Sequence, residues 1–222
     1  VKGITTNRTW NGGPVEEHSR EARRIVHLCS ADDRIQVISG ANGDYITLKD
    51  SINNPDFDGK KAVDFIIEQA RLMQDQQKLV LIPVGKLTNI ALALKKDPSI
   101  ISKVKVVWLG SNWPGPGEYN MDNDTYAVMW ICTVYGGTME VRSTKTEISD
   151  RLSGLGKEVS PVEGRHGGSF DKIGDYLVNL WENVNEESRS LFDMAAVATV
   201  KNPDWAEATV VYGPRLMNGI WT

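Results

Sequence analysis

The residues best suited to chemistry lie in the loop 110–120. It contains Asn112, Glu118 and Asn120, and its glycines and prolines exclude a long regular element. The loop follows Lys103–Leu109, an apolar run rich in β-branched residues that predicts a buried strand. A carboxylate accepts hydrogen bonds from vicinal hydroxyls, and an amide both donates and accepts them. Because open α/β sheets bind ligands at the carboxyl ends of strands, this loop indicates recognition of hydroxyl groups.

The same loop also has a structural interpretation. Glu118 and Asn120 alternate with Tyr119, so an extended backbone would turn the two polar side chains to one side. Asp124 is the expected N-cap of a helix that continues to about Tyr135. From spacing alone, a polar loop capped onto this helix therefore stands beside the hydroxyl-binding interpretation.

A second loop begins at Val84, after a continuous apolar strand that we expect to be buried on both faces. Gly85 would permit a sharp turn, and Thr88 or Asn89 would cap the next helix, which makes a structural turn the default interpretation. The alternative is that the Val84 carbonyl, left free at the strand end, is a hard oxygen ligand for a cation.

Two further residues carry a structural and a functional interpretation each. Asp193 lies at the start of a helix that is apolar on most faces. Its negative charge would compensate the helix dipole there, and the alternative is that its carboxylate binds a metal ion. His166 is flanked by glycines, which predicts an exposed loop residue or, alternatively, a general acid on a mobile lid. We expect His18 and His27 at the surface or boundary of the first helix.

Strand-like and helix-like segments alternate, which predicts an α/β fold with a mostly parallel sheet and helices on both faces. The expected strands are 35–40, 79–84, 103–109 and 138–143, and the expected helices are 16–29, 61–74, 88–96, 124–135, 171–183 and 189–200. Right-handed crossovers then place the loops near Ser39, Val84 and Gly110 at one sheet edge. No change in composition divides the chain, so we expect a single domain over residues 1–222.

Composition limits the partners. Hydrophobic residues at 41% and charged residues at 24% are typical of a soluble globular domain. A net charge of −4 with dispersed basic residues argues against nucleic acid as a partner. No apolar run approaches the roughly 20 residues that cross a bilayer, so no membrane partner is expected. Cys29 and Cys132 lie in apolar helical patterns, which predicts reduced buried thiols, with a disulfide or a metal pair as the alternatives.

Three segments resemble the inosine-uridine-preferring nucleoside hydrolase family. Pro83–Ile100 resembles its G-P-L-T-N-I-A-L-A segment, and Glu118–Asn120 with Asp124 resembles its E-F-N…D-P-E-A segment. Leu191–Ala198 resembles its late H-D-P-L-A-V-A segment. The segments 1–6 and 35–41 also fall in family order, so the resemblance extends to about Trp205.

The resemblance implies a Rossmann-like fold and hydrolysis of the N-glycosidic bond of ribonucleosides by calcium-activated water. It implies a nucleoside or riboside as small-molecule partner and a homodimer or homotetramer. The compartment would be cytoplasmic or, after removal of a signal peptide, periplasmic or secreted. By correspondence, Asn112, Glu118 and Asn120 would bind ribose hydroxyls, and Asp193 and the Val84 backbone carbonyl would bind calcium. Asn7 and Asn11 are unassigned candidates for a further sugar contact.

The chain departs from the family pattern in two ways. The D-x-D-x-x-x-D-D motif, which supplies most calcium carboxylates and the water-activating aspartate, belongs upstream of Val1, and the chain stops at Thr222 sooner than family members do. We therefore expect truncation at both ends and an unassigned catalytic base. Phe192 replaces the histidine that protonates the leaving base, which makes His166 the candidate general acid. A non-catalytic riboside-binding relative and a structural fragment that folds only as an oligomer are the alternatives to an enzyme.

Overall fold

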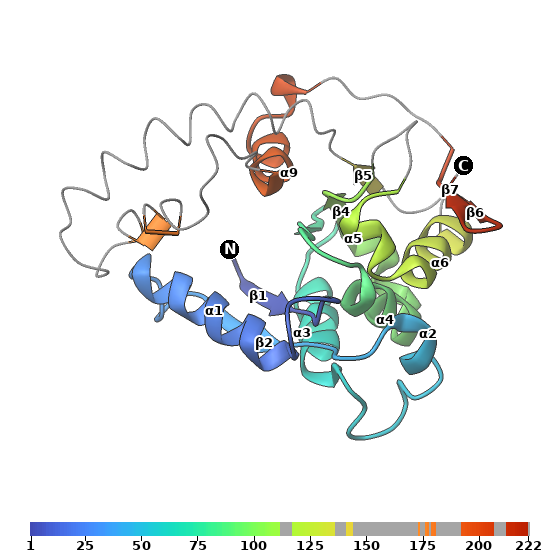
Figure 1. Ribbon diagram of the computed structural model, residues 1–222, viewed down its shortest axis with the longest axis horizontal. Helices are drawn as coiled ribbons and strands as arrows, with labels where there is room; N and C mark the ends of the chain where they lie inside the picture. Colours follow the sequence, from blue (N-terminus) through green and yellow to red (C-terminus); the bar gives the residue numbers. More distant parts are fainter. Residues whose placement is uncertain are drawn as a thin grey trace.

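The computed structural model describes residues 1–111, 117–135, 141–143, 173, 176–177, 179–180, 192–206 and 212–221 (Figure 1). Its described strands are β1 Gly3–Thr6, β2 Gln36–Ser39, β3 Leu79–Leu81, β4 Val104–Trp108, β5 Val141–Ser143, β6 Leu216–Met217 and β7 Ile220–Trp221. Its described helices are α1 Val15–Leu28, α2 Tyr45–Leu48, α3 Lys60–Arg71, α4 Thr88–Lys96, η1 Pro98–Lys103, α5 Tyr119–Asp122, α6 Thr125–Tyr135, α9 Phe192–Lys201 and η2 Pro203–Trp205.

The parallel strands form two groups. β1 pairs with β2 from Gly3↔Gln36 to Thr6↔Ser39, and β4 lies between β3 and β5, parallel to both. Parallel pairing confirms the α/β prediction, although the described strands do not join into one continuous sheet. The antiparallel hairpin β6–β7 is separate from both groups. The sequence patterns did not predict β1.

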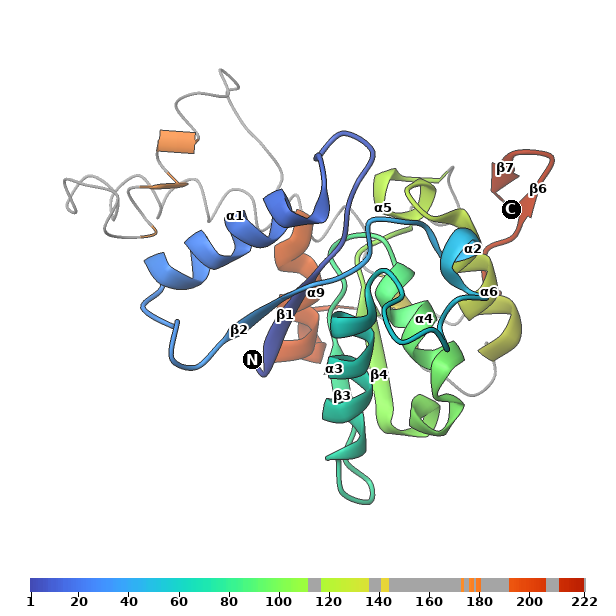
Figure 2. The ribbon, with the colours of Figure 1, turned by 90° about the horizontal axis from the view of Figure 1, so that it is seen from below.

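Helices cover both faces of the β1–β2 pair. Figure 2 shows the two strands side by side between α1 and α3. A Cβ on Gly3 would lie 2.7 Å from the Phe65 ring of α3, so the backbone of β1 is in direct contact with that helix. Residues 3 and 6 point to opposite faces of a strand. On the second face, the Thr6 hydroxyl shares a 2.8 Å hydrogen bond with Ser19 of α1.

Strand β4 is buried on both faces, as predicted. Val104, Val106 and Trp108 lie in the main hydrophobic cluster with residues of α3, α4 and α6. Val107 and Leu109 form a second cluster with Ala196 of α9. The loop that follows β4 therefore starts from a well-anchored point.

The prediction that 79–84 is a strand buried on both faces is wrong. β3 ends at Leu81, and Val80, Ile82 and Val84 are 39%, 37% and 42% exposed. Leu79 and Leu81 pack against the main cluster. Because alternate residues of an extended chain point to opposite faces, only one face of this segment is covered in the described structure.

The helix predictions are mostly confirmed. Helix α4 has the predicted bounds, and α1, α3 and α6 occupy the predicted regions. Much of the predicted helix 171–183 and the residues 138–140 and 189–191 lie outside the described residues. Cys29 was predicted to be a buried thiol within a helix, but it is exposed at the C-cap of α1, where the chain leaves the helix; Cys132 is half-buried, and both thiols are free. Among the described helices, none combines the length and apolar character that crossing a bilayer requires.

Candidate functional site

The loops after β1 and β2 are joined by the side chain of Asn89. Its Nδ2 donates a 2.9 Å hydrogen bond to the Thr6 carbonyl, and its Oδ1 accepts a 3.1 Å bond from the Ala41 amide. Gly40 permits this contact, because a Cβ there would lie 2.2 Å from the Thr6 oxygen and from Asn89 Nδ2. Asn89 thus connects strand ends, and the prediction that it caps α4 is wrong.

Asp124 joins three more segments from a buried position. Oδ2 accepts bonds of 2.8 Å from the Tyr45 amide and 2.5 Å from the Thr88 hydroxyl, and Oδ1 accepts a 3.1 Å bond from the Ala127 amide. The last bond confirms Asp124 as the N-cap of α6. Thr88 is therefore not a helix cap either. Burial raises the pKa of the Asp124 carboxyl, although these hydrogen bonds and the charge of Lys86 oppose the shift.

Glu118 and Asn120 are fixed by the one-turn helix α5. Residues 119–122 are helical, so the extended arrangement considered for this loop is not present. Glu118 is the N-cap, with Oε2 accepting a 3.0 Å bond from the Asn120 amide and Oε1 a 2.5 Å bond from the Met121 amide. Asn120 Nδ2 donates a 2.9 Å bond to the Leu109 carbonyl at the end of β4. Burial raises the pKa of the Glu118 carboxyl, while its backbone hydrogen bonds oppose the shift.

The loop after β3 includes the Val84 carbonyl, which was predicted to be a free oxygen. The Pro83 carbonyl accepts from the Leu109 amide at 3.2 Å, and the Gly85 carbonyl accepts from Trp108 Nε1 at 2.9 Å. The Lys86 carbonyl accepts from Asn7 Nδ2 at 3.4 Å. Among the described residues none donates to the Val84 carbonyl, which agrees with the free oxygen expected there.

The described residues do not make up a complete calcium site. Asp193 lies in the first turn of α9, and partial desolvation raises the pKa of its carboxyl although the residue is exposed at the surface. In the described part of the chain, no three His, Cys, Asp or Glu side chains gather at one point. Calcium takes about six to eight oxygen ligands. Asp193 and the Val84 carbonyl are too few, and Asn112 and His166 lie outside the described residues.

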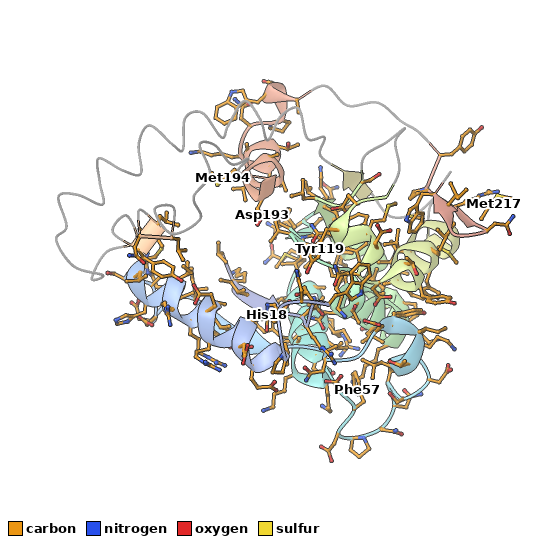
Figure 3. All side chains as sticks on the ribbon, viewed as in Figure 1. His18, Phe57, Tyr119, Asp193, Met194 and Met217 are labelled. Carbon is orange, nitrogen blue, oxygen red and sulfur yellow. The ribbon has the colours of Figure 1, made fainter. Side chains whose placement is uncertain are left out.

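Sequence reasoning named Asn7 and Asn11 in the loop after β1 but left out Trp10. Trp10 is 62% exposed and meets Tyr119, 44% exposed, edge to face with ring centroids 6.1 Å apart. The Trp10 amide donates a 3.0 Å bond to Asn123 Oδ1, and the Tyr119 hydroxyl donates to Asn11 Oδ1. Figure 3 labels Tyr119 near the start of α5. The available signal was the run Ile4–Thr6, whose β-branched residues favour a strand that ends just before Asn7.

Asn7 adds a polar group to this edge. Its Oδ1 is buried and has no hydrogen-bond partner among the described residues, whereas its Nδ2 reaches the loop after β3. A buried acceptor without a donor is costly, so such an atom is a suitable contact for a ligand hydroxyl. Asn7 follows β1 directly, which places it at the same strand end as the Thr6 carbonyl.

Comparison with known proteins identifies the family. Residues 1–216 match the profile of the family described as inosine-uridine preferring nucleoside hydrolase. The chain belongs to this family.

Curated relatives of this nucleoside hydrolase family member are named as nucleoside hydrolases. The chain is 27% identical to the inosine-uridine preferring nucleoside hydrolase of Leishmania major over 152 residues, 66% of this chain and 48% of that protein. It is 25% identical to the pyrimidine-specific ribonucleoside hydrolase RihB of Escherichia coli over 158 residues, 68% of this chain and 50% of that protein. The chain therefore spans about half the length of the curated relatives it matches.

Solved structures of nucleoside hydrolases share the fold. The purine-preferring ribonucleoside hydrolase from Gardnerella vaginalis has a TM-score of 0.64 at 20% identity, with 98% of this chain and 76% of that chain covered. An inosine-guanosine nucleoside hydrolase has a TM-score of 0.68 at 19% identity, covering 92% and 71%. These likenesses confirm the Rossmann-like α/β fold.

Proposed function

We propose that this protein hydrolyses the N-glycosidic bond of ribonucleosides. In this reaction the bond between the sugar C1′ and the base nitrogen breaks, water supplies the hydroxyl to C1′, and the base leaves with a proton. The supporting observation is the fixed position of Glu118 and Asn120 at the end of β4, in a chain of the nucleoside hydrolase family.

Glu118 and Asn120 retain capacity for ribose hydroxyls. A carboxylate offers about four lone-pair sites, and Glu118 uses two of them for backbone amides. Asn120 uses one Nδ2 proton for Leu109, which leaves its Oδ1 and a second proton. Glycosidic cleavage passes through an oxocarbenium-like state, so a carboxylate beside the sugar would stabilise the developing positive charge. Asn112 is proposed as a third hydroxyl ligand.

The exposed pair Trp10 and Tyr119 is the proposed contact for the nucleobase. In an edge-to-face pair, the edge of one ring meets one face of the other. The remaining ring faces of Trp10 and Tyr119 therefore stay available to a third ring. Stacking of a base on an aromatic side chain contributes about 1–3 kcal/mol. Trp10→Ala is therefore expected to weaken nucleoside binding at least about fivefold while free ribose binds as before, measured by calorimetry. Equal losses for both ligands would contradict this role.

Calcium enters the proposal with only part of its coordination assigned. The Asp193 carboxylate and the Val84 carbonyl are the proposed oxygen ligands, and the bound ion would activate water. No described residue is assigned the role of general base, and His166 stays the proposed general acid because Phe192 cannot carry a proton.

Release of nucleobase from inosine and uridine, followed by chromatography, tests the activity. We expect release by the wild-type chain and a loss of at least about a hundredfold in Glu118→Gln, because the charge beside the sugar is removed. The exposed Glu16→Gln is the matched control. Base release that is unchanged in Glu118→Gln would exclude the proposed role.

A riboside-binding protein without hydrolysis is the second candidate function. The observation that favours it is the lack of an acidic cluster among the described residues. Calorimetry with ribose and inosine separates the two, because a binding protein gives heat of binding and no free base. Loss of both signals would exclude this candidate and the enzyme together.

Self-association is proposed for the exposed face of 80–84. Val80, Ile82 and Val84 lie on one side of the chain and expose apolar surface, which soluble proteins commonly cover at an interface. A homodimer or homotetramer in light scattering, reduced to a monomer by Ile82→Asn, would support it. A wild-type monomer would exclude it.

A further inference from the structure

The C-terminal hairpin holds the segment that carries Glu118 and Asn120. Trp221 Nε1, at the end of β7, donates a 2.8 Å hydrogen bond to Asp122 Oδ1. A Cβ on Gly117 would lie 2.4 Å from Cδ1 and 2.5 Å from Nε1 of the same indole. The Trp221 ring also packs against the main hydrophobic cluster. The indole of Trp221 therefore contacts the segment Gly117–Asp122 at its first residue, Gly117, and at its last, Asp122.

This segment has little stability of its own. Helix α5 is a single turn of four residues, and isolated turns of helix are unfavourable because nucleation costs more than one hydrogen bond returns. Its other described anchors are the Asn120 bond to Leu109, the contacts of Tyr119 with Asn11 and Trp10, and Met121, which is buried in the main hydrophobic cluster. The position of the Glu118 carboxylate therefore depends on contacts from outside the turn.

We propose that Trp221 is a positioning residue that keeps Gly117–Asp122 in the conformation able to bind a sugar. This inference rests on the proposed function, because it concerns the same Glu118 and Asn120. The family profile matches residues 1–216, so Trp221 and β7 lie beyond the matched region.

Hydrogen exchange and ligand binding together test the proposal. In Trp221→Ala, the amides of Asn120 and Met121, which donate to Glu118, should exchange at least about tenfold faster, and ribose and inosine should bind about tenfold more weakly. Trp221→Phe keeps an aromatic ring but loses the donor, so it should show an intermediate effect. Asp122→Asn keeps an Oδ1 acceptor for the indole, so its exchange rates and ligand affinities should stay close to those of the wild-type chain. Trp205→Ala, at a site that is 60% exposed, is the control.

The two readouts separate failure of this inference from failure of the proposed function. Unchanged exchange at both amides in Trp221→Ala would overturn the positioning role, whatever the ligand data show. Faster exchange without sugar binding by the wild-type chain would overturn the proposed function and leave the structural role intact. If Trp221→Ala does not fold, Trp221→Phe and Asp122→Ala supply the same comparison, and wild-type exchange in both would overturn the proposal.

Discussion

The Thr88 hydroxyl donates a 2.5 Å hydrogen bond to Oδ2 of Asp124 and so joins the start of α4 to the start of α6. Both residues are buried. A donor to a buried carboxylate contributes more than one at the surface, because water cannot replace it. The relative position of the loops after β3 and β4 therefore depends on this contact.

Removal of that donor should destabilise the fold. We expect Thr88→Val to lower the free energy of unfolding by about 1–3 kcal/mol, because Asp124 loses one of three donors. Urea denaturation gives the value. Thr47→Val is the matched control, since the Thr47 hydroxyl bonds the Asp44 carbonyl at an exposed site. Equal effects of the two substitutions would contradict the importance assigned to Asp124.

Stability should respond to pH through Glu118. Burial raises the pKa of its carboxyl above 4.5, so the folded state holds this proton more tightly than the unfolded chain does. The stabilisation is complete below the unfolded pKa and is lost as pH rises through the folded pKa. Relative to Glu118→Gln, the wild-type chain should therefore lose stability as pH rises above 4.5 and through the raised pKa. Urea denaturation across this range, with Glu16→Gln as control, measures it; a rising difference would contradict the raised pKa.

Substitution by alanine should stabilise the protein at Gly85 and destabilise it at Gly59. Gly85 lies outside the left-handed region and a Cβ there would meet no atom within 4 Å, so the glycine is not required for the turn. Gly85→Ala should raise the free energy of unfolding by about 0.4–1 kcal/mol. At Gly59 the backbone φ is +88°, and an added Cβ would lie 2.9 Å from Ala41. Gly59→Ala should therefore lower the free energy of unfolding. Thermal denaturation distinguishes them, and destabilisation by Gly85→Ala would show an unrecognised constraint.

The two free cysteines should differ in reactivity. Burial raises the pKa of the Cys132 thiol to about 11, which leaves about one thiolate in a thousand at pH 8. Cys29 is exposed. The Cys29 thiol should therefore react rapidly with Ellman's reagent, and the Cys132 thiol should react only on unfolding. Cys29→Ser should abolish the fast phase. Two fast thiols in the native chain would contradict the burial of Cys132.

The two assigned calcium ligands should by themselves hold the ion only weakly. Asp193 and the Val84 carbonyl offer far fewer than the about six to eight oxygens that calcium takes, and no described cluster adds carboxylates. Titration with calcium chloride should give a Kd no tighter than about 10⁻³ M and no rise in Tm. Micromolar binding that Asp193→Asn abolishes would contradict this and would place the missing ligands outside the described residues.

Local patterns determined much of the fold. The apolar run 103–109 predicted β4 because a strand buried on both faces needs apolar residues at every position. The helical stripes predicted α1 and α3, and Asp124 was recognised as an N-cap because capping depends on residues three positions apart. The segments that resemble the family also follow from sequence alone.

The partners of individual side chains were decided only by tertiary structure. Thr88 and Asn89 suit a helix cap, but the folded chain brings Asp124, Thr6 and Ala41 within their reach, and those buried groups take the hydrogen bonds. Trp221 lies 99 residues from Asp122, so no local pattern predicts their contact. The sequence by itself determined which residues are proposed to bind a sugar, because that choice rests on side-chain chemistry and local pattern, and the packing of distant segments decided which contacts hold them.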